Sequence, residues 1–247
     1  MSNKVTVEIC VDSVESAAAA QVGGADRVEL CDNLVDGGTT PSSGAIEIAR
    51  KQLDIRLNVI VRPRGGDFLY SDVEFEIMKH DIKVAKGHGA DGVVIGILDP
   101  DGNIDISRTA DLVERSQPMS VTFHRAFDVS RDAFRSLEDL IRVGVDRILT
   151  SGQQPTADEG CELIGKLVDA AGDRITIMAC GGLNEDNVAG IVAATGVREV
   201  HFTAFTETAS QMRFRNESVF MGGAAATSEY SRAVTDIEKV RRMIAKM

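Results

Sequence analysis

Two short segments of the sequence pair a carboxylate with a thiol at a spacing of two residues. Glu8 and Cys10 occur in VEIC, and Glu29 and Cys31 occur in VELC. Side chains alternate along a β-strand, so each carboxylate shares a face with its cysteine. If the two segments are neighbouring strands, Cys10 and Cys31 come within reach of each other, and two thiolates suit a soft ion such as Cu(I). The alternative is that both are small buried hydrophobic residues, as free cysteines usually are.

Basic residues form a second group. The segment VTFHRAFD, residues 121–128, places His124 and Arg125 inside a pattern that otherwise resembles a buried strand. An unpaired buried charge is costly or titrates away, so these two residues need partners or a function. Consecutive side chains face opposite ways. We therefore expect one of them to reach a pocket and the other to brace the strand end through Asp128 or a neighbouring carboxylate.

Acid–base chemistry is the next possibility. Glu8 and Glu29 need partners, because carboxylates are almost never fully buried alone. A histidine, with an unperturbed pKa near about 6.5, is a natural general acid or base. The candidate catalytic residues are Glu8, Glu29, His124, Arg125 and His201. An ion-pair network with a purely structural role is the alternative.

Two glycine pairs predict an anion site. RPRGGDF, residues 62–68, sets two arginines around a proline and continues into a glycine pair whose exposed amides suit phosphate or carboxylate. CGGLN, residues 180–184, places a second pair before an expected helix, whose amino end would attract an anion. The candidate anion-binding residues are Arg62, Arg64, Gly65, Gly66, Gly181 and Gly182. Together the two motifs favour a small anionic ligand.

The elements that must position these residues repeat along the chain. Four segments combine a glycine that can end a helix, a short turn and a run rich in β-branched residues, namely Gly23–Cys31, His88–Gly96, Val143–Gly152 and Thr195–Ala204. They start roughly fifty to sixty residues apart, close to two βα units. The other expected strands are Val5–Cys10, Ile55–Arg62, Ser120–Phe127 and Thr176–Gly181.

This count predicts eight strands, each followed by a helix, in 247 residues. The fold class is therefore α/β, a (β/α)8 TIM barrel forming a single domain over residues 1–247. An open doubly wound sheet is the alternative, although no G-x-G-x-x-G follows the first strand. Chemistry in a TIM barrel lies at the carboxyl ends of the strands, so the candidate residues would share one mouth.

Capping residues predict where several helices begin. We expect helices from Ser13 to about Gln21, from Asp72 to about Lys86 and from Asn184 to about Ala194. The last helix is expected over 235–246, with a capping box between Thr235 and Glu238.

The long segment 205–233 follows the eighth strand. It exceeds an ordinary βα loop, so we expect a lid or an interface there, or else a solvated loop. Its MRFRN stretch, with Arg213 and Arg215, could add positive charge over the mouth.

Composition limits the classes of partner. The net charge of −11 argues against nucleic acid and anionic membranes, and the lack of Trp and scarcity of Tyr leave few stacking platforms. No apolar run is long enough to span a bilayer, and the amino terminus has no secretory pattern, so we expect a cytoplasmic protein. The four cysteines are too scattered for a disulfide framework. Of these, Cys161 and Cys180 are assigned to packing.

The motifs together resemble the CutC family of copper homeostasis proteins. The matching segments, in order, are VEIC, GADRVELC, GGTTPSSG, RPRGGDFLYSD, VTFHRAFD, RILTSGQ, EVHF, MRFRN and EYSR. They extend from about Val7 to Arg232, nearly the whole chain. The resemblance implies a cytosolic TIM barrel concerned with copper. It also implies Cu(I) as the bound ion, with Cys10 and Cys31 as its ligands.

Three functions remain open from the residues. The first is copper homeostasis through Cu(I) at the barrel mouth. The second is an enzyme, a lyase, isomerase or hydrolase, acting on a small phosphorylated or carboxylated metabolite in the same pocket lined by Arg, His and Glu. The third is a scaffold whose long final loop makes a homo-oligomer contact.

Overall fold

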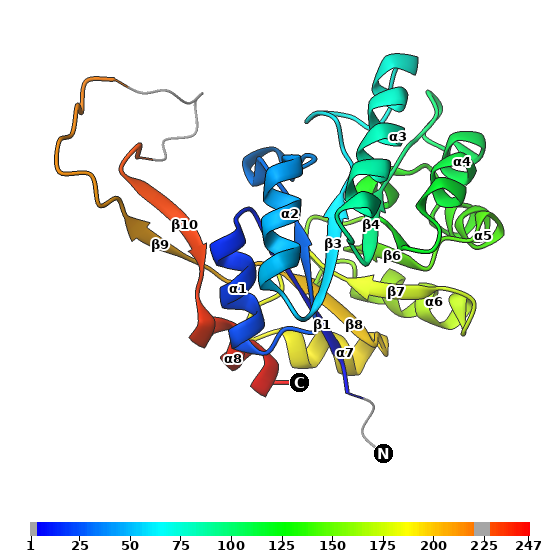
Figure 1. Cartoon of the computed structure of the whole chain (residues 1–247). Helices are drawn as coiled ribbons and strands as arrows, with labels where there is room; N and C mark the ends of the chain where they lie inside the picture. Colours follow the sequence, from blue (N-terminus) through cyan, green and yellow to red (C-terminus); the bar gives the residue numbers. More distant parts are fainter. Residues whose placement is uncertain (1–3, 220–227) are drawn as a thin grey trace.

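A closed ring of parallel strands forms the centre of the computed structural model, which describes residues 4–219 and 228–247 (Figure 1). The strands pair in sequence order and the eighth pairs with the first. They are β1 (Thr6–Val11), β2 (Arg27–Leu30), β3 (Arg56–Ile60), β4 (Gly92–Ile95), β5 (Ser120–Phe123), β6 (Arg147–Thr150), β7 (Thr176–Ala179) and β8 (Glu199–Phe202). This arrangement confirms the predicted TIM barrel.

Helices connect successive strands and surround the barrel (Figure 1). They are α1 (Val14–Gly23), α2 (Ser43–Gln52), α3 (Asp72–Gly87), α4 (Ile106–Ser116), α5 (Ala133–Val143), α6 (Cys161–Ala171), α7 (Val188–Thr195) and α8 (Ile237–Ala245). Two 3-10 helices, η1 (Leu34–Asp36) and η2 (Arg125–Val129), lie in the connections after β2 and β5. None of these helices, within the described ranges, has both the length and the apolar character needed to cross a bilayer.

Strand β1 shows how side chains alternate between the surrounding hydrophobic core and the barrel interior. In β1, Val7, Ile9 and Val11 belong to the main hydrophobic core. Glu8 and Cys10, which alternate with them, are buried among polar and sulfur-containing side chains. The period-two pattern that predicted a strand therefore also decides which residues enter the barrel.

The helix start expected from the sequence is correct for α1 and wrong for α3. Ser13 caps α1, with its hydroxyl accepting a hydrogen bond from the backbone N–H of Ser16 at 3.2 Å. The cap of α3 is Ser71, so the expected cap at Asp72 is wrong by one residue. Ser71 and Glu74 form a complete capping box, in which the side chain of each residue accepts a hydrogen bond from the backbone N–H of the other.

The last two expected caps are also corrected. Helix α7 begins only at Val188. The residues before it form a turn, in which the backbone N–H of Asn184 donates to the side-chain oxygen of Asn187. Helix α8 is capped by Asp236, whose carboxylate accepts from the backbone N–H of Lys239 at 2.9 Å. Thr235 ends a strand instead, so the predicted capping box does not form.

The segment 205–233 contains two strands where a long loop was expected, and its residues 220–227 lie outside the described residues. Strands β9 (Phe205–Ala209) and β10 (Ser231–Thr235) form an antiparallel ribbon that extends outward beside α1 (Figure 1). The β-branched residues of these strands favour extended backbone, although the ribbon lacks a hydrophobic face that would have revealed it in the sequence. In the chain between the two strands, the guanidinium group of Arg215 stacks on the ring of Tyr230 at 5.2 Å.

Candidate metal and acid–base site

The sulfur atoms of Cys10 and Cys31 lie 3.7 Å apart inside the barrel. Cys10 is near the carboxyl end of β1, and Cys31 directly follows β2. Both are buried, with exposed fractions of 6% and 2%. The connection after β2 covers them, since a side chain at Gly38 would come within 3.3 Å of the Cys31 sulfur. The strand pairing predicted from the sequence thus brings the two thiols together.

The pKa values of the two thiols shift in opposite directions. The hydrogen bond between the sulfurs lowers the pKa of Cys10 to about 6. The same hydrogen bond, together with burial, raises the pKa of Cys31 well above its ordinary value. Near neutral pH the pair therefore holds one thiolate and one thiol, and soft thiolate donors of this kind suit Cu(I).

Glu8 and His201 form a buried pair beside the cysteines. His201 Nδ1 lies 2.7 Å from Glu8 Oε1. Burial opposes ionisation of Glu8, but Arg27 and His201 outweigh it and lower its pKa to about 2. Burial likewise opposes a charge on His201, yet hydrogen bonds with Cys10 and Glu8 raise its pKa well above its ordinary value. This pair is therefore ionic at neutral pH.

Glu29 occupies the space between this pair and the thiols. Its Oε2 lies 3.6 Å from His201 Nε2, whereas its Oε1 is buried and has no hydrogen-bond partner among the described residues. Burial and the nearby Cys10 raise the pKa of Glu29 well above its ordinary value. The structure therefore brings together five of the residues singled out in the sequence, namely Glu8, Cys10, Glu29, Cys31 and His201.

A layer of charges deeper in the barrel was missed by the sequence reasoning. Arg27 pairs with Glu8 and also with Glu199, which in turn pairs with Arg147 at 2.9 Å. Asn58 donates to Glu8 Oε2 at 3.1 Å. From the sequence, the site was expected at the carboxyl ends of the strands, whereas Arg27, Arg147 and Glu199 are the first residues of β2, β6 and β8. The signal was available, because Arg27 precedes Glu29 by one strand period and so faces the interior.

The two arginines of RPRGGDF hold loops in place. Arg62 donates to the backbone carbonyls of Asp36 and Gly38, both at 2.7 Å, and of Gly66 at 2.9 Å. Arg64 pairs with Glu74 at 2.6 Å and with Asp67 at 3.0 Å. An anion at the terminal nitrogens of these guanidinium groups would have to replace protein acceptors that they already have.

The two glycine pairs lie in tight turns. Gly66 has φ +83°, and a side chain at Gly65 would come within 3.1 Å of Asp36. Gly181 and Gly182 have φ values of +89° and +73°. The carbonyl of Gly182 accepts from the side-chain amides of Asn184 and Asn187 at 3.1 and 2.9 Å. Because α7 starts well after this turn, the expectation that the second pair leads directly into a helix is wrong.

His124 and Arg125 enter different environments. His124 Nδ1 accepts from the backbone N–H of Ala126 at 3.1 Å, and its ring lies 4.9 Å from that of Phe68. Burial, followed by the charge of Arg62, lowers the pKa of His124 to about 3, so its ring is neutral. Arg125 instead pairs with Asp128 at 2.7 Å and donates to Ser151, which joins the ends of β5 and β6. Arg125 therefore has the expected bracing role, through Asp128, and access of His124 to a pocket stays a prediction.

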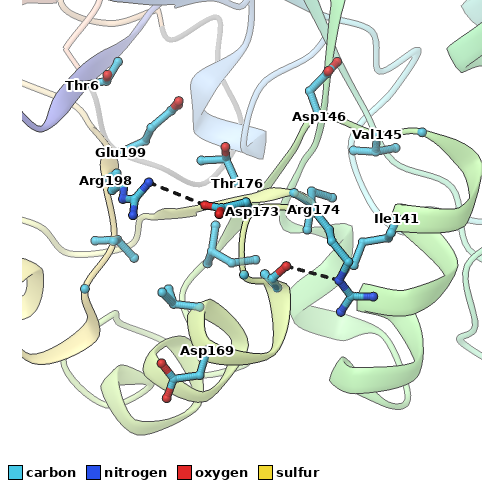
Figure 2. A pocket seen from close by; sticks show the side chains of 18 of the residues that line it. Thr6, Ile141, Val145, Asp146, Asp169, Asp173, Arg174, Thr176, Arg198 and Glu199 are labelled. Atoms are coloured by element: carbon cyan, nitrogen blue, oxygen red, sulfur yellow. Dashed lines mark hydrogen bonds and ion pairs between the residues drawn. The ribbon is translucent and has the colours of Figure 1, made fainter.

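A hollow of about 1000 Å³ lies at the opposite end of the barrel. Residues at the amino ends of β6, β7 and β8 line it, and Figure 2 shows its ion pair between Asp173 and Arg198, 3.9 Å apart. It contains none of the site residues predicted from the sequence. In TIM barrels this end serves stability, so we locate the candidate chemistry at the cysteine cluster.

Comparison with known proteins agrees with this picture. The sequence profile of the CutC family matches residues 5–206. The chain is 49% identical to the copper homeostasis protein cutC homolog of Mus musculus, over 98% of this chain and 89% of the mouse protein. It is 52% identical to a family protein CutC of Bacteroides fragilis, over 96% of this chain and 95% of that protein.

Solved structures support the same assignment. A CutC crystal structure from Streptococcus agalactiae superposes with a TM-score of 0.78 at 37% identity, covering 81% of this chain and 98% of that one. A thiamine phosphate pyrophosphorylase of Pyrococcus furiosus, at 21% identity and a TM-score of 0.56 over 82% and 87% of the two chains, shares the fold alone. The chain belongs to the CutC family of copper homeostasis proteins.

Proposed function

We propose that this chain takes part in copper homeostasis by binding Cu(I) through the thiolates of Cys10 and Cys31. The observation that carries the proposal is the 3.7 Å separation of two buried sulfur atoms. Sulfur ligands select soft ions such as Cu(I) over the harder ions of the cell. We assign the function to the cytoplasm, where reducing conditions keep both sulfurs as thiols.

The surroundings support this donor pair. Cys10 carries the thiolate, with a pKa of about 6, so an incoming ion has to displace one proton, from Cys31. Ligands must be deprotonated to bind, and a charged neighbour makes the loss of that proton easier. His201, hydrogen-bonded to Glu8 at 2.7 Å, supplies a positive charge beside the thiolate. Burial of both sulfurs restricts exchange of the ion with solvent.

An anaerobic competition with a Cu(I) chelator tests the proposal. Changing both Cys10→Ser and Cys31→Ser removes the two soft ligands, and we expect the affinity to fall by at least about 100-fold. Cys161→Ser is the matched control, because this cysteine lies partly exposed on α6, away from the pair. Arg62→Ala should also leave the affinity nearly intact. Equal affinity in the double variant and the control would remove cysteine ligation from consideration.

An enzymatic function is the second candidate, and one observation favours it. The Nε of Arg62 and the Nε2 of His124 are buried without hydrogen-bond partners in the described part of the chain. Both residues contact Phe68, whose ring centroid lies 5.2 Å from the Arg62 Cζ and 4.9 Å from the His124 ring. Oxygen atoms of a phosphorylated or carboxylated metabolite would satisfy these groups. His124 or Glu29 would then move the proton in a lyase, isomerase or hydrolase reaction.

Crystals grown in sulfate or phosphate separate the two candidates. The enzymatic proposal predicts an anion beside Arg62 and Arg64, with the connections after β2 and β3 moved aside so that the Arg62 guanidinium is released from their carbonyl oxygens. Repeated structures at high salt with no anion at this position would count against it. That result would leave the cysteine proposal unaffected.

A further inference from the structure

The carboxylate of Glu29 lies close enough to both cysteines to share an ion with them. One ligand atom from each of Cys10, Glu29 and Cys31 lies within 4.8 Å of the other two. Pairing of β1 with β2 sets Cys10 directly opposite Glu29, and Cys31 follows one strand period later. The carboxylate is therefore held beside the two sulfurs by strand register rather than by a flexible loop.

The separation of the sulfurs indicates a bent arrangement around an ion. At a metal–sulfur distance of about 2.3 Å, sulfurs 3.7 Å apart subtend an angle close to the tetrahedral one. A linear two-ligand geometry requires about 4.6 Å at the same bond length. The observed spacing leaves one side of the ion open to a further donor, and Glu29 is the nearby carboxylate.

Glu29 is also the carboxylate with an uncommitted oxygen. The residue is only 3% exposed, and its Oε1 has no hydrogen-bond partner among the described residues. Buried polar atoms in folded proteins nearly always have a hydrogen-bond partner, so we expect this oxygen to contact a bound group. Glu8 is different, because His201, Arg27 and Asn58 already occupy its two oxygens.

We propose that Cys10, Cys31 and Glu29 form a three-ligand site that binds a divalent ion such as Zn²⁺ as well as Cu(I). The inference rests on the cysteine pair of the proposed function and adds the carboxylate. Two thiolates with a carboxylate oxygen are a normal donor set for Zn²⁺, whereas an oxygen donor adds little for Cu(I). His201, 3.6 Å from Glu29 Oε2, orients the carboxylate as residues around metal ligands do.

Titration with Co²⁺ under anaerobic conditions tests this site. Co²⁺ takes the tetrahedral geometry of Zn²⁺, and its absorption reports thiolate ligation directly. We expect the wild type to bind Co²⁺ with sulfur-to-metal charge-transfer bands and to lose them on addition of Zn²⁺. Glu29→Gln should weaken Co²⁺ binding by at least about tenfold and leave Cu(I) affinity within about threefold. Glu15→Gln, on the exposed face of α1, is the matched control.

The outcomes separate this inference from the proposed function. If the wild type binds Co²⁺ but not Cu(I), the three-ligand site for a divalent ion stands, whereas the copper proposal and the binding of Cu(I) at this site both fail. If it binds Cu(I) but neither Co²⁺ nor Zn²⁺, or if Glu29→Gln binds Co²⁺ as the wild type does, the three-ligand site is overturned. X-ray absorption of the Zn²⁺-loaded wild type needs no variant. It should show two sulfurs at about 2.3 Å and an oxygen at about 2.0–2.2 Å, and a shell without sulfur would refute the assignment.

Discussion

His124 and Arg125 show how one step along the chain changes the chemistry of a basic residue. His124 is enclosed, with its Nδ1 satisfied by the backbone N–H of Ala126, and its ring stays neutral. Arg125 is exposed to solvent, and its charge is matched by Asp128. Burial without a counter-charge suppresses ionisation, whereas contact with solvent or with a carboxylate preserves it. The same rule accounts for the ionic pair of His201 and Glu8.

The neutral state of His124 makes stability depend on pH. Its pKa is about 3 in the folded chain and near 6.5 when unperturbed, so the unfolded chain binds more protons between these values. The free energy of unfolding therefore falls as the pH drops below about 6.5, by at most about 1.4 kcal/mol per pH unit. Urea unfolding between pH 7.5 and 4.5 should show a shallower decline for His124→Asn, whose side-chain oxygen can replace Nδ1 as acceptor. His80→Asn, on the exposed face of α3, should decline as the wild type does. Parallel curves for wild type and His124→Asn would contradict the prediction.

At the scale of elements, short-range hydrogen bonds decide where α3 begins. Ser71 starts α3 through a reciprocal arrangement in which its hydroxyl accepts from the Glu74 N–H and the Glu74 carboxylate accepts from the Ser71 N–H. Asp72 is the first helical residue, and its side chain pairs instead with Arg108. Ser71 and Asp72 thus have different roles, although serine and aspartate are both preferred at the N-cap and residue preference alone does not distinguish them.

The two roles predict different costs on truncation. Ser71→Ala removes the acceptor for a helix N–H and should lower the free energy of unfolding by about 1 kcal/mol. Asp72→Ala breaks an ion pair whose carboxylate is almost fully exposed, and such pairs contribute little. Urea denaturation of both variants measures the difference, and Ser71→Thr should retain most of the wild-type stability. A larger loss for Asp72→Ala would show that Asp72 is the cap.

At the scale of the whole molecule, the barrel is filled by charges as well as by hydrophobic residues. The guanidinium group of Arg27, on β2, pairs with Glu8 on β1 and Glu199 on β8, and contacts the sulfur of Met178 on β7 at 3.3 Å. Its side chain is fully enclosed. This arginine joins strands from both ends of the chain and supports the carboxylate that holds His201.

Loss of Arg27 leaves the buried carboxylate of Glu8 and the partly buried carboxylate of Glu199 without their shared cation. Arg27→Met keeps much of the side-chain volume and should lower the free energy of unfolding by about 3–5 kcal/mol, the usual cost of removing one partner of a buried ion pair. Arg174→Met is the control, since the pair that Arg174 forms with Glu138 lies on the surface and should matter far less. Chemical denaturation compares the two. A similar small loss in both variants would mean that the buried network adds no stability.

Several features of this protein are determined by its sequence alone. Alternation along a strand is a local property, so the sequence already shows that Glu8 shares a face with Cys10, and Glu29 with Cys31. The regular spacing of glycine-led strands determines the barrel, because eight βα units of this length have few ways to close. From these two facts the proximity of the cysteines follows without coordinates.

Only the tertiary structure decided which charges meet inside the barrel. Glu8 and His201 lie at opposite ends of the chain and become neighbours only when β8 pairs with β1. Arg62 faces the carbonyls of a loop whose path the sequence does not specify. Which side chains pair depends on the register of all the strands in the closed ring and on the conformation of the loops between them. A local sequence pattern does not specify either of these.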